Sequence, residues 1–284
     1  MKLVSFSESG RERFGAVVDE DVVDLTGTAA ATTLAELIGA DGGLDAARER
    51  VERGSASVPF ADCVLLPPIP RPTKILCVGV NYVAHAEEAG REVGEYPVIF
   101  QRYAETLVPH RGALLRPRVS EQFDYEGELA IVIGRGGAHI DENSALTHVA
   151  GYACFNDASV RDWQFHTRQY GMGKNFLGSG GFGPWLVTTD EIADHHALRV
   201  RTVVSGEELQ NESVASLAFD IPYLVSYTSQ ALPWYPGDVL STGTPSGVGF
   251  TRDPPRFLKD GDQVDVVIDG VGTLTNVVVD EGSA

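Results

Sequence analysis

Hydrophobic and polar residues alternate in short stretches at the start of the chain. Lys2 to Phe6, Arg13 to Val18 and Val22 to Leu25 each show the pattern of a strand with one buried face. Thr33 to Ile38 and Leu44 to Arg53 instead carry Ala, Leu, Glu and Arg at positions that favour helix. The first part of the chain is therefore predicted to form a small α+β unit.

A proline-rich segment follows this unit. Residues 66–72 hold four prolines, which excludes a helix or a central strand and predicts a stiff, extended linker. We therefore predict a domain boundary here. The small N-terminal domain would span residues 1–68, and a larger domain would span residues 69–284.

The pattern after the linker is rich in strands. Lys74 to Val80 is typical of a buried strand, and a short helix from about Val83 to Ala89 is predicted to end at Gly90. Short strands then alternate with turns rich in Gly and Pro, up to Gln263 to Ile268 and Gly272 to Val279. This favours a strand-rich α+β fold with a mixed β-roll or sandwich over a parallel α/β sheet.

The composition restricts the possible partners. The 284 residues include 40 acidic and 22 basic side chains, a net charge of −18, and no basic stripe that would bind nucleic acid. No apolar run approaches the roughly 18 residues that span a bilayer. The three cysteines form no zinc or disulfide pattern, and the N-terminus lacks the apolar core of a signal peptide. We expect a cytoplasmic protein that does not bind membranes.

Two carboxylates stand two residues apart, directly before an apolar run. Glu126 and Glu128 point to the same face of the predicted strand, with Cβ atoms roughly 6–7 Å apart. Two buried carboxylates this close would repel each other unless a cation lay between them. Oxygen ligands without His or Cys favour Mg²⁺, Mn²⁺ or Ca²⁺. The alternative is a surface strand with two solvated acids.

A second acidic position ends another apolar strand. Asp157 precedes Arg161 and Gln164 by four and seven residues, so the three could share one face of a helix. Such a group can bind a metal and also hold carboxylate or enolate oxygens. The alternative is that Asp157 is a helix N-cap with a surface ion pair to Arg161, although this gives no reason for Gln164.

A candidate general base lies on the short helix after the first buried strand. His85 and Glu88 are three residues apart, so the carboxylate can orient the imidazole. A His–Glu pair of this kind can activate water or remove a carbon-bound proton. The alternative is a routine pair on a surface helix. His195 and His196 are adjacent in a polar stretch, and we interpret them as solvated.

Two further segments could contact an anion. Lys174 lies among glycines and aromatic residues, where a partly buried ammonium would need an anionic partner; an exposed loop lysine is the alternative. Residues 241–249 form a turn rich in backbone N–H groups and hydroxyls, which could hold an anionic group or merely reverse the chain. Neither this turn nor the glycines at 178–183 match a nucleotide-binding motif.

These segments together resemble the fumarylacetoacetate hydrolase superfamily, including its acylpyruvase and 2-hydroxyhepta-2,4-diene-1,7-dioate isomerase members. Five motifs occur in the family's order and span about residues 72 to 278. They are Asn81-Tyr82-x-x-His85-x-x-Glu88, Asp124-Tyr125-Glu126-Gly127-Glu128-Leu129, Asn156-Asp157-x-Ser159-x-Arg161-Asp162-x-Gln164, Gly173-Lys174 to Gly183-Pro184, and Gly243-Thr244-Pro245-x-Gly247-Val248-Gly249.

The resemblance implies a β-roll catalytic domain, a homodimer and a bound Mg²⁺ or Mn²⁺, with Ca²⁺ as a further option. By analogy Glu126, Glu128 and Asp157 would be the metal ligands. The catalytic residues would be His85 with Glu88 as the base, and Arg161, Gln164 and Lys174 around the oxyanion or enolate. Tyr82, Arg102 and Thr244 would bind substrate. Arg102 departs from the family, because many relatives carry Lys there, and this departure leaves the substrate open.

The implied function is a metal-dependent hydrolase that cleaves a carbon–carbon bond in an acylpyruvate or a related 2,4-diketo acid, such as those of aromatic catabolism. The partner would be a small anionic keto acid, and the bond would break through an enolate. Alternatives within the family are decarboxylation of oxaloacetate and isomerisation or hydration of a 2-oxo-hexenedioate. A non-catalytic binding module is a different class, against which the His85–Glu88 pair argues because a binder needs no base.

Overall fold

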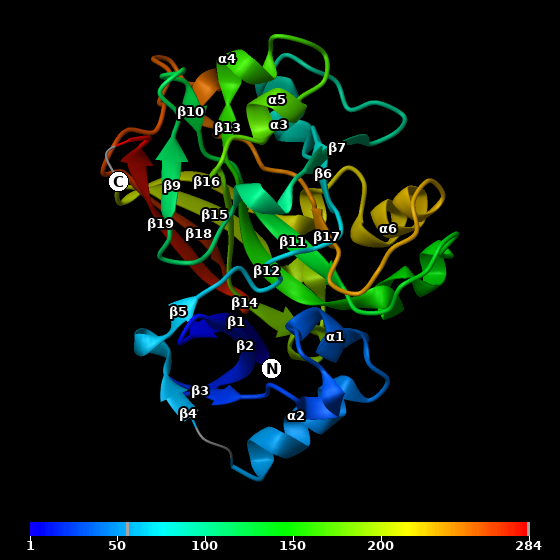
Figure 1. The fold of residues 1–284 in the computed structure, drawn as a ribbon. Coiled ribbons are helices and arrows are strands. Elements are labelled where there is room, and N and C mark those ends of the chain that lie inside the picture. The colour runs from blue at the N-terminus through cyan, green and yellow to red at the C-terminus, as the bar shows by residue number, and fades with distance from the viewer. Residues whose placement is uncertain (55–56, 283–284) are drawn as a thin grey trace.

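The computed structural model describes residues 1–54 and 57–282 and shows a strand-rich α+β fold, as predicted (Figure 1). The helices are short and lie around the sheets. They are α1 (Leu34–Gly39), α2 (Gly43–Glu52), α3 (Val83–Glu88), α4 (Arg161–Gln164), α5 (Gly171–Lys174) and α6 (Ile221–Ser229).

Three sheets contain the strands of the described chain. The large sheet has the order β4-β3-β2-β1-β14-β12-β11-β17-β6-β7, with β5 beside β1 and β8 beside β14. Its strands are β1 (Lys2–Glu8), β2 (Arg11–Val18), β3 (Asp21–Asp24), β4 (Ser57–Pro59), β5 (Val64–Leu65), β6 (Ile75–Gly79), β7 (Val98–Arg102), β8 (Leu107–Val108), β11 (Gly127–Ile133), β12 (Val149–Asp157), β14 (Gly180–Thr188) and β17 (Val239–Ser241). A second sheet has the order β16-β15-β18-β19-β9, and β10 pairs with β13. These strands are β9 (Ala113–Arg116), β10 (Phe123–Asp124), β13 (Ser159–Val160), β15 (Arg199–Val204), β16 (Glu207–Ser213), β18 (Gln263–Ile268) and β19 (Gly272–Asp280).

The large sheet continues through the N-terminal part of the chain. β1 pairs antiparallel with β14, with Lys2 opposite Val187, and the Met1 ammonium donates a hydrogen bond to Thr188 Oγ1 at 2.5 Å. The proline-rich segment between β5 and β6 forms no helix or strand. In Figure 1 the elements β1 to β4, α1 and α2 gather at one end of the molecule, opposite α3, α4 and α5.

The local predictions for this part are confirmed, with ends that differ by a few residues. The three N-terminal strands form β1, β2 and β3, and the two helices form α1 and α2. Helix α1 begins after Thr33, whose side chain accepts a hydrogen bond from the backbone N–H of Glu36; this is a standard N-cap. Helix α3 ends before Gly90, which has a φ of 65°.

Strand β11 is buried on both faces, which places its ends inside the molecule. Leu129 and Ile131 pack in a core shared with the second sheet, including Val200 of β15. Ala130 packs in another core, which includes Leu34 of α1. Any charged side chain at the start of β11 is therefore removed from bulk water.

Candidate active site

Three carboxylates meet where β11 begins and β12 ends. Glu126 immediately precedes β11, Glu128 lies in it, and Asp157 is the last residue of the neighbouring antiparallel strand β12. The side chains of all three are buried, with 4%, 2% and 0% of the respective residues exposed. One oxygen from each lies within 4.8 Å of the others. The structure thus brings together the three residues proposed as metal ligands.

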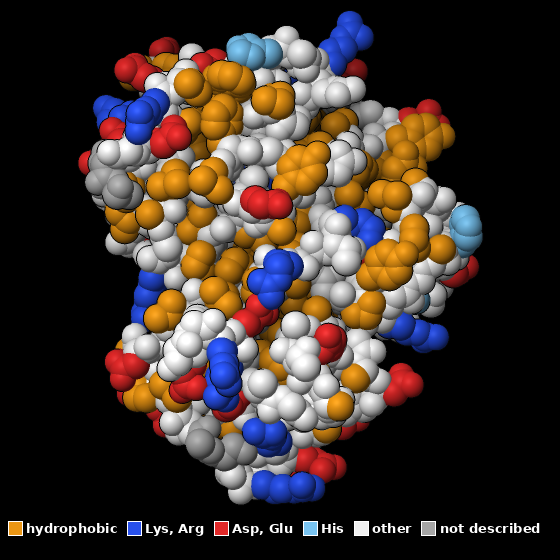
Figure 2. All heavy atoms as spheres, in the orientation of Figure 1, with side chains coloured by type: hydrophobic (Ala, Val, Ile, Leu, Met, Phe, Trp, Pro, Cys, Tyr) orange, Lys and Arg blue, Asp and Glu red, His pale blue; other side chains and the backbone are white. Residues whose placement is uncertain are grey.

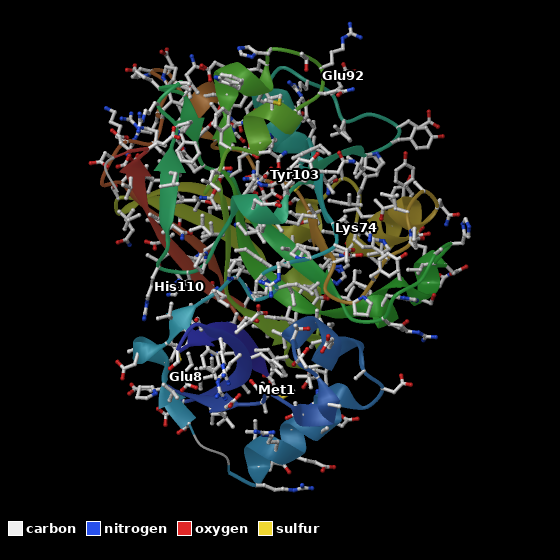
Figure 3. The ribbon with its side chains drawn as sticks, in the orientation of Figure 1. Met1, Glu8, Lys74, Glu92, Tyr103 and His110 are labelled. Carbon is white, nitrogen blue, oxygen red and sulfur yellow. The ribbon has the colours of Figure 1, made fainter. Side chains whose placement is uncertain are left out.

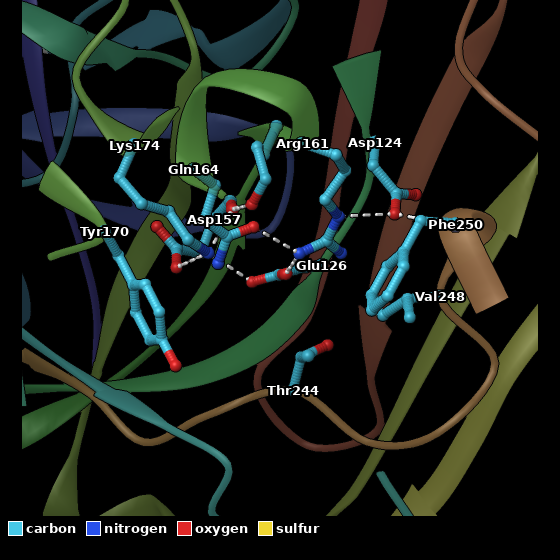
Figure 4. Close-up of polar contacts among 12 residues, drawn as sticks. Asp124, Glu126, Asp157, Arg161, Gln164, Tyr170, Lys174, Thr244, Val248 and Phe250 are labelled. Atoms are coloured by element: carbon cyan, nitrogen blue, oxygen red, sulfur yellow. Dashed lines mark hydrogen bonds and ion pairs between the residues drawn. The ribbon is translucent and has the colours of Figure 1, made fainter. Parts of the chain in front are cut away.

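Buried cations neutralise part of this negative charge. The Lys174 Nζ atom lies 2.5 Å from Glu126 Oε2 and 2.5 Å from Asp157 Oδ2, so the ammonium bridges the two carboxylates (Figure 4). Arg102 Nη1 donates to Asp157 Oδ1 at 2.6 Å from the other side. Lys174 is thus buried rather than on an exposed loop, and its partners are carboxylates of the protein itself.

Arg161 contacts two acids of the cluster, Glu126 and Asp124, and no role was predicted for Asp124. Its Nε atom donates to Asp124 Oδ2 at 2.8 Å, and its Nη1 atom lies 2.5 Å from Glu126 Oε1 (Figure 4). Nη1 also donates to Gln164 Oε1 at 2.9 Å. Its Nη2 atom is buried and has no hydrogen-bond partner among the described residues. Arg161 therefore keeps one donor available for a ligand.

The predicted helical face of Asp157, Arg161 and Gln164 is wrong. Strand β12 continues to Asp157, and α4 begins only at Arg161 with Val160 as its N-cap. Asp157 is therefore neither an N-cap nor the partner of Arg161. The three side chains still line one pocket, because the chain turns between the strand and the helix.

The charges of this cluster do not cancel. With every group counted as ionised, four buried acids and three buried bases leave one formal negative charge. The acids are Asp124, Glu126, Glu128 and Asp157, and the bases are Arg102, Arg161 and Lys174.

The pKa values show where that negative charge is least compensated. Burial alone would raise the pKa of Glu126, but the charges of Arg161 and Lys174 lower it to about 2. Burial, together with the charges of Asp157 and Glu126, raises the pKa of Glu128 well above its usual range. Glu128 forms no ion pair in the described part of the chain and accepts only from neutral donors, Ser241 Oγ at 2.5 Å and the N–H of Gly243 at 2.9 Å.

This donor set fits a hard divalent cation. Clustered carboxylate oxygens with one uncompensated charge are the ligands that Mg²⁺, Mn²⁺ and Ca²⁺ prefer. Glu126, Glu128 and Asp157 would hold the ion, with Lys174 adjacent to two of them. A bound cation would also relieve the repulsion that raises the pKa of Glu128.

The predicted base pair is formed and faces the same pocket. His85 Nδ1 lies 2.9 Å from Glu88 Oε1, and both oxygens of Glu88 accept from the N–H of Gly247, at 3.0 and 2.9 Å. Because a carboxylate only accepts, the proton of this contact belongs to Nδ1 of the imidazole. The other nitrogen, Nε2, then carries a lone pair and can act as a base.

The turn at residues 241–249 organises the acids, as its N–H groups suggested. It binds carboxylates of the protein itself, and each backbone donor reaches a different segment. The pairs are Gly243 with Glu128 (2.9 Å), Gly247 with Glu88 (2.9 Å) and Gly249 with Asp124 (2.8 Å). The Thr244 hydroxyl donates to the Gly127 carbonyl at 3.0 Å and lines the pocket.

These groups line one pocket, whose empty space of about 450 Å³ includes open solvent at its mouth. Its lining includes every residue proposed as a metal ligand or catalytic group except Glu88, which acts from behind His85. Phe100, Phe165 and Phe250 supply apolar walls. The lining residues that were missed from the sequence include Arg91, Tyr170 and Phe165. A basic residue just after the helix-ending glycine was the available signal for Arg91.

Two residues proposed to bind substrate do not line this pocket. Arg102 is 2% exposed, and its guanidinium donates to Asp157 Oδ1 and, at 2.6 Å, to Ser179 Oγ. Tyr82 is 0% exposed, because it lies at the start of α3 in a bridge to Leu217. Both are placed to support the site from outside the pocket rather than to touch a ligand within it.

The interpretation of His195 as solvated is wrong. It is 6% exposed, and its Nε2 atom lies 3.0 Å from Asp220 Oδ1. His196 is half-exposed and contacts both Asp220 and Asp194. These histidines do not line the pocket.

A cluster of buried charged side chains at a pocket is typical of an enzyme active site. The family described as fumarylacetoacetate (FAA) hydrolase C-terminal matches residues 74–279, and the chain belongs to this family. A mitochondrial oxaloacetate tautomerase of Homo sapiens is 40% identical over 238 residues, which cover 83% of this chain and 76% of that protein. An oxaloacetate tautomerase of Bacillus subtilis is 40% identical over 232 residues, 80% of this chain and 77% of that one.

Solved structures share the fold over the whole chain. The 2-hydroxyhepta-2,4-diene-1,7-dioate isomerase of Mycobacterium marinum superimposes with a TM-score of 0.79 at 29% identity, covering 100% of both chains. Maleylpyruvate hydrolase of Sphingobium sp. SYK-6, solved with manganese(II) and pyruvate, gives a TM-score of 0.83 at 30% identity and covers 99% of each chain. Among the described residues, no helix is long and apolar enough to cross a membrane.

Proposed function

We propose that this protein interconverts the keto and enol forms of a small 2-oxo acid. The observation that carries the proposal is the placement of His85 in one pocket with Arg161, Lys174 and the three carboxylates. Enolisation needs a base beside the carbon next to the keto group and positive charge beside the keto oxygen. The oxaloacetate tautomerases at 40% identity support this choice of reaction.

His85 would move the proton. Its Nε2 lone pair accepts a proton from the carbon next to the keto group, and the C–H electrons form the new carbon–carbon double bond. The electrons of the C=O bond move to the keto oxygen, which takes up a proton from water to give the enol, and His85 Nε2 releases its proton back to water. Glu88 keeps the proton on Nδ1 and so keeps Nε2 free to react. The reverse sequence returns the ketone.

The residues opposite the base would stabilise the oxygen. Arg161 Nη2 is buried and without a partner among the described residues, so it can donate to the oxygen as its negative charge grows. A divalent cation, when bound by Glu126, Glu128 and Asp157, would polarise the keto and carboxylate oxygens of the substrate. Mg²⁺ and Mn²⁺ are the proposed ions.

The test is the decay of enol oxaloacetate, followed by ultraviolet absorbance with Mn²⁺ present. We expect the wild-type protein to accelerate the decay over a Mn²⁺ blank, and His85→Gln to reduce that acceleration by roughly 10²- to 10⁴-fold. Lack of acceleration by Mn²⁺-loaded wild-type protein would refute the proposal.

Hydrolysis of a carbon–carbon bond in an acylpyruvate is the second candidate. The same His85–Glu88 pair could take a proton from water, and a hydrolase solved with manganese(II) and pyruvate shares the fold at 30% identity. Product analysis separates the two reactions, because hydrolysis in ¹⁸O-labelled water places the label in the released acid and tautomerisation releases nothing. Release of CO₂ from oxaloacetate would instead indicate a decarboxylase.

A further inference from the structure

Arg91 differs from the other basic side chains that line the pocket. Lys174 and Arg161 each contact two carboxylates of the protein. Arg91 forms no ion pair with any carboxylate among residues 1–54 and 57–282, although the chain carries 40 acidic residues. The adjacent acid, Glu92, is exposed at the outer edge of the molecule (Figure 3). A cation facing a pocket without an anionic partner is available to a ligand.

The backbone holds Arg91 in a fixed position relative to the base. Gly90 has a φ of 65°, and the N–H of Arg91 donates to the Ala86 carbonyl at 2.8 Å. These are features of a Schellman motif, which ends helix α3 and sets the direction of the chain after it. The short helix that carries His85 therefore presents Arg91 to the same pocket.

Aromatic side chains hold the guanidinium and separate it from the carboxylates. Arg91 Cζ lies 5.3 Å from the ring centre of Tyr170 and 5.8 Å from that of Phe165, and its Nη1 atom donates to the Tyr170 hydroxyl. Tyr170 packs edge-on against Phe100 with centres 5.7 Å apart, and Lys174 Nζ lies 5.1 Å from the Phe100 ring. Two rings thus stand between the ammonium of the cluster and the guanidinium of Arg91.

We infer that Arg91 binds a second carboxylate, at the end of the substrate away from its 2-oxo acid group. This inference rests on the proposed function and narrows its substrates to 2-oxo dicarboxylates. A carboxylate matches the two-pronged donor geometry of a guanidinium, whereas a neutral acyl tail would leave a half-buried cation without a partner. The face in Figure 2 shows basic side chains scattered among acidic ones, so a dianion must be met by local charges such as Arg91.

The test compares oxaloacetate with its 4-methyl ester, which has the same skeleton but a neutral tail. In Arg91→Gln we expect the KM for oxaloacetate to rise about 10- to 100-fold, the effect of losing a charged hydrogen bond. The KM for the ester should stay within twofold of wild type. Arg91→Lys keeps the charge but not the two-pronged geometry of the guanidinium. Its KM for oxaloacetate should lie between the values of wild type and Arg91→Gln. Arg168→Gln removes the same charge from an exposed residue outside the pocket and serves as the control.

The outcomes separate this inference from the proposed function. An equal change of KM for diacid and ester in Arg91→Gln, or no change in either, overturns the role of Arg91. If wild-type protein enolises neither compound, the proposed function fails, and Arg91 is then tested by binding alone. In that case oxaloacetate should raise the melting temperature of wild type but not of Arg91→Gln, and equal shifts in both proteins refute the inference.

Discussion

Replacing Lys174 with Met tests how much its buried ammonium contributes to the stability of the folded protein. The ammonium lies 2.5 Å from Glu126 and from Asp157, and 2% of the residue is exposed. Burial alone would lower the pKa of Lys174, but the two carboxylates outweigh it and raise that pKa, so the lysine is charged. Met keeps most of the aliphatic chain, so the main loss is the charge.

The expected loss is large, because the substitution leaves two buried carboxylates with less compensation. Removing one partner of a buried ion pair costs about 3–5 kcal/mol. A chain somewhat longer than 250 residues loses roughly 2 °C or more per kcal/mol, so the melting temperature should fall by on the order of 10 °C. A divalent cation at the same carboxylates should recover much of this loss, because binding to the folded state alone stabilises it.

The assay is thermal unfolding in EDTA and in millimolar Mn²⁺. We expect Lys174→Met to melt well below wild type in EDTA. We also expect Mn²⁺ to raise its melting temperature by more than it raises that of wild type. Lys259→Met, at an exposed position without an ion pair among the described residues, is the matched control. Coincident melting of Lys174→Met and wild type in EDTA would refute the conclusion that the Lys174 ammonium stabilises the buried carboxylates of Glu126 and Asp157.

Three further changes test other parts of the structure. Glu128→Gln should weaken Mn²⁺ binding roughly tenfold or more, measured by calorimetry, because it removes a charged ligand; unchanged affinity would contradict the ligand set. Glu88→Gln should lower kcat for enolisation more than it changes KM, since it alters the proton position on His85; a KM effect alone would assign Glu88 to binding. Burial lowers the pKa of His110 from 6.5 to about 4, and its Nδ1 accepts the N–H of Thr275 at 3.0 Å. As pH falls from 6.5 toward 4, His110 is protonated in the unfolded state but not yet in the folded state. The free energy of unfolding should therefore decrease over this range. His110→Gln should flatten this slope in urea unfolding, and an unchanged slope would exclude His110 as its source.

Local patterns were sufficient to predict most strands and helices and three of the four buried acids of the site, because Asp124 was given no role. The apolar run after Glu128 and the one before Asp157 identified the two strands, and the spacing of His85 and Glu88 identified the base pair. Each of these depends on residues a few positions apart. Alternation of side chains along a strand is enough to place such groups on one face.

Contacts across long stretches of sequence could not be predicted in this way. Arg102 was proposed to bind substrate, but its partner Asp157 lies 55 positions away and holds it outside the pocket. Likewise, β1 joins the large sheet beside β14, although Lys2 and its partner Val187 are nearly the whole chain apart. Strand pairing and buried ion pairs of this kind are fixed by the packing of the entire core, which no single segment of the sequence determines.

The way each carboxylate is held explains how one pocket can serve both a cation and a base. The turn at residues 241–249 donates uncharged backbone N–H groups to Glu128 and Glu88. Neutral donors orient a carboxylate without cancelling its charge, whereas Lys174 cancels much of the charge on its partners. Glu128 therefore remains available to a cation, and Glu88 remains available to the imidazole N–H. Gly247 allows this arrangement because its φ is 100° and a Cβ there would lie 2.0 Å from the Leu209 carbonyl oxygen. Any shift of this turn would move Glu128, the proposed metal ligand, together with Glu88, the partner of His85. The backbone, more than the ion pairs, therefore sets their relative position.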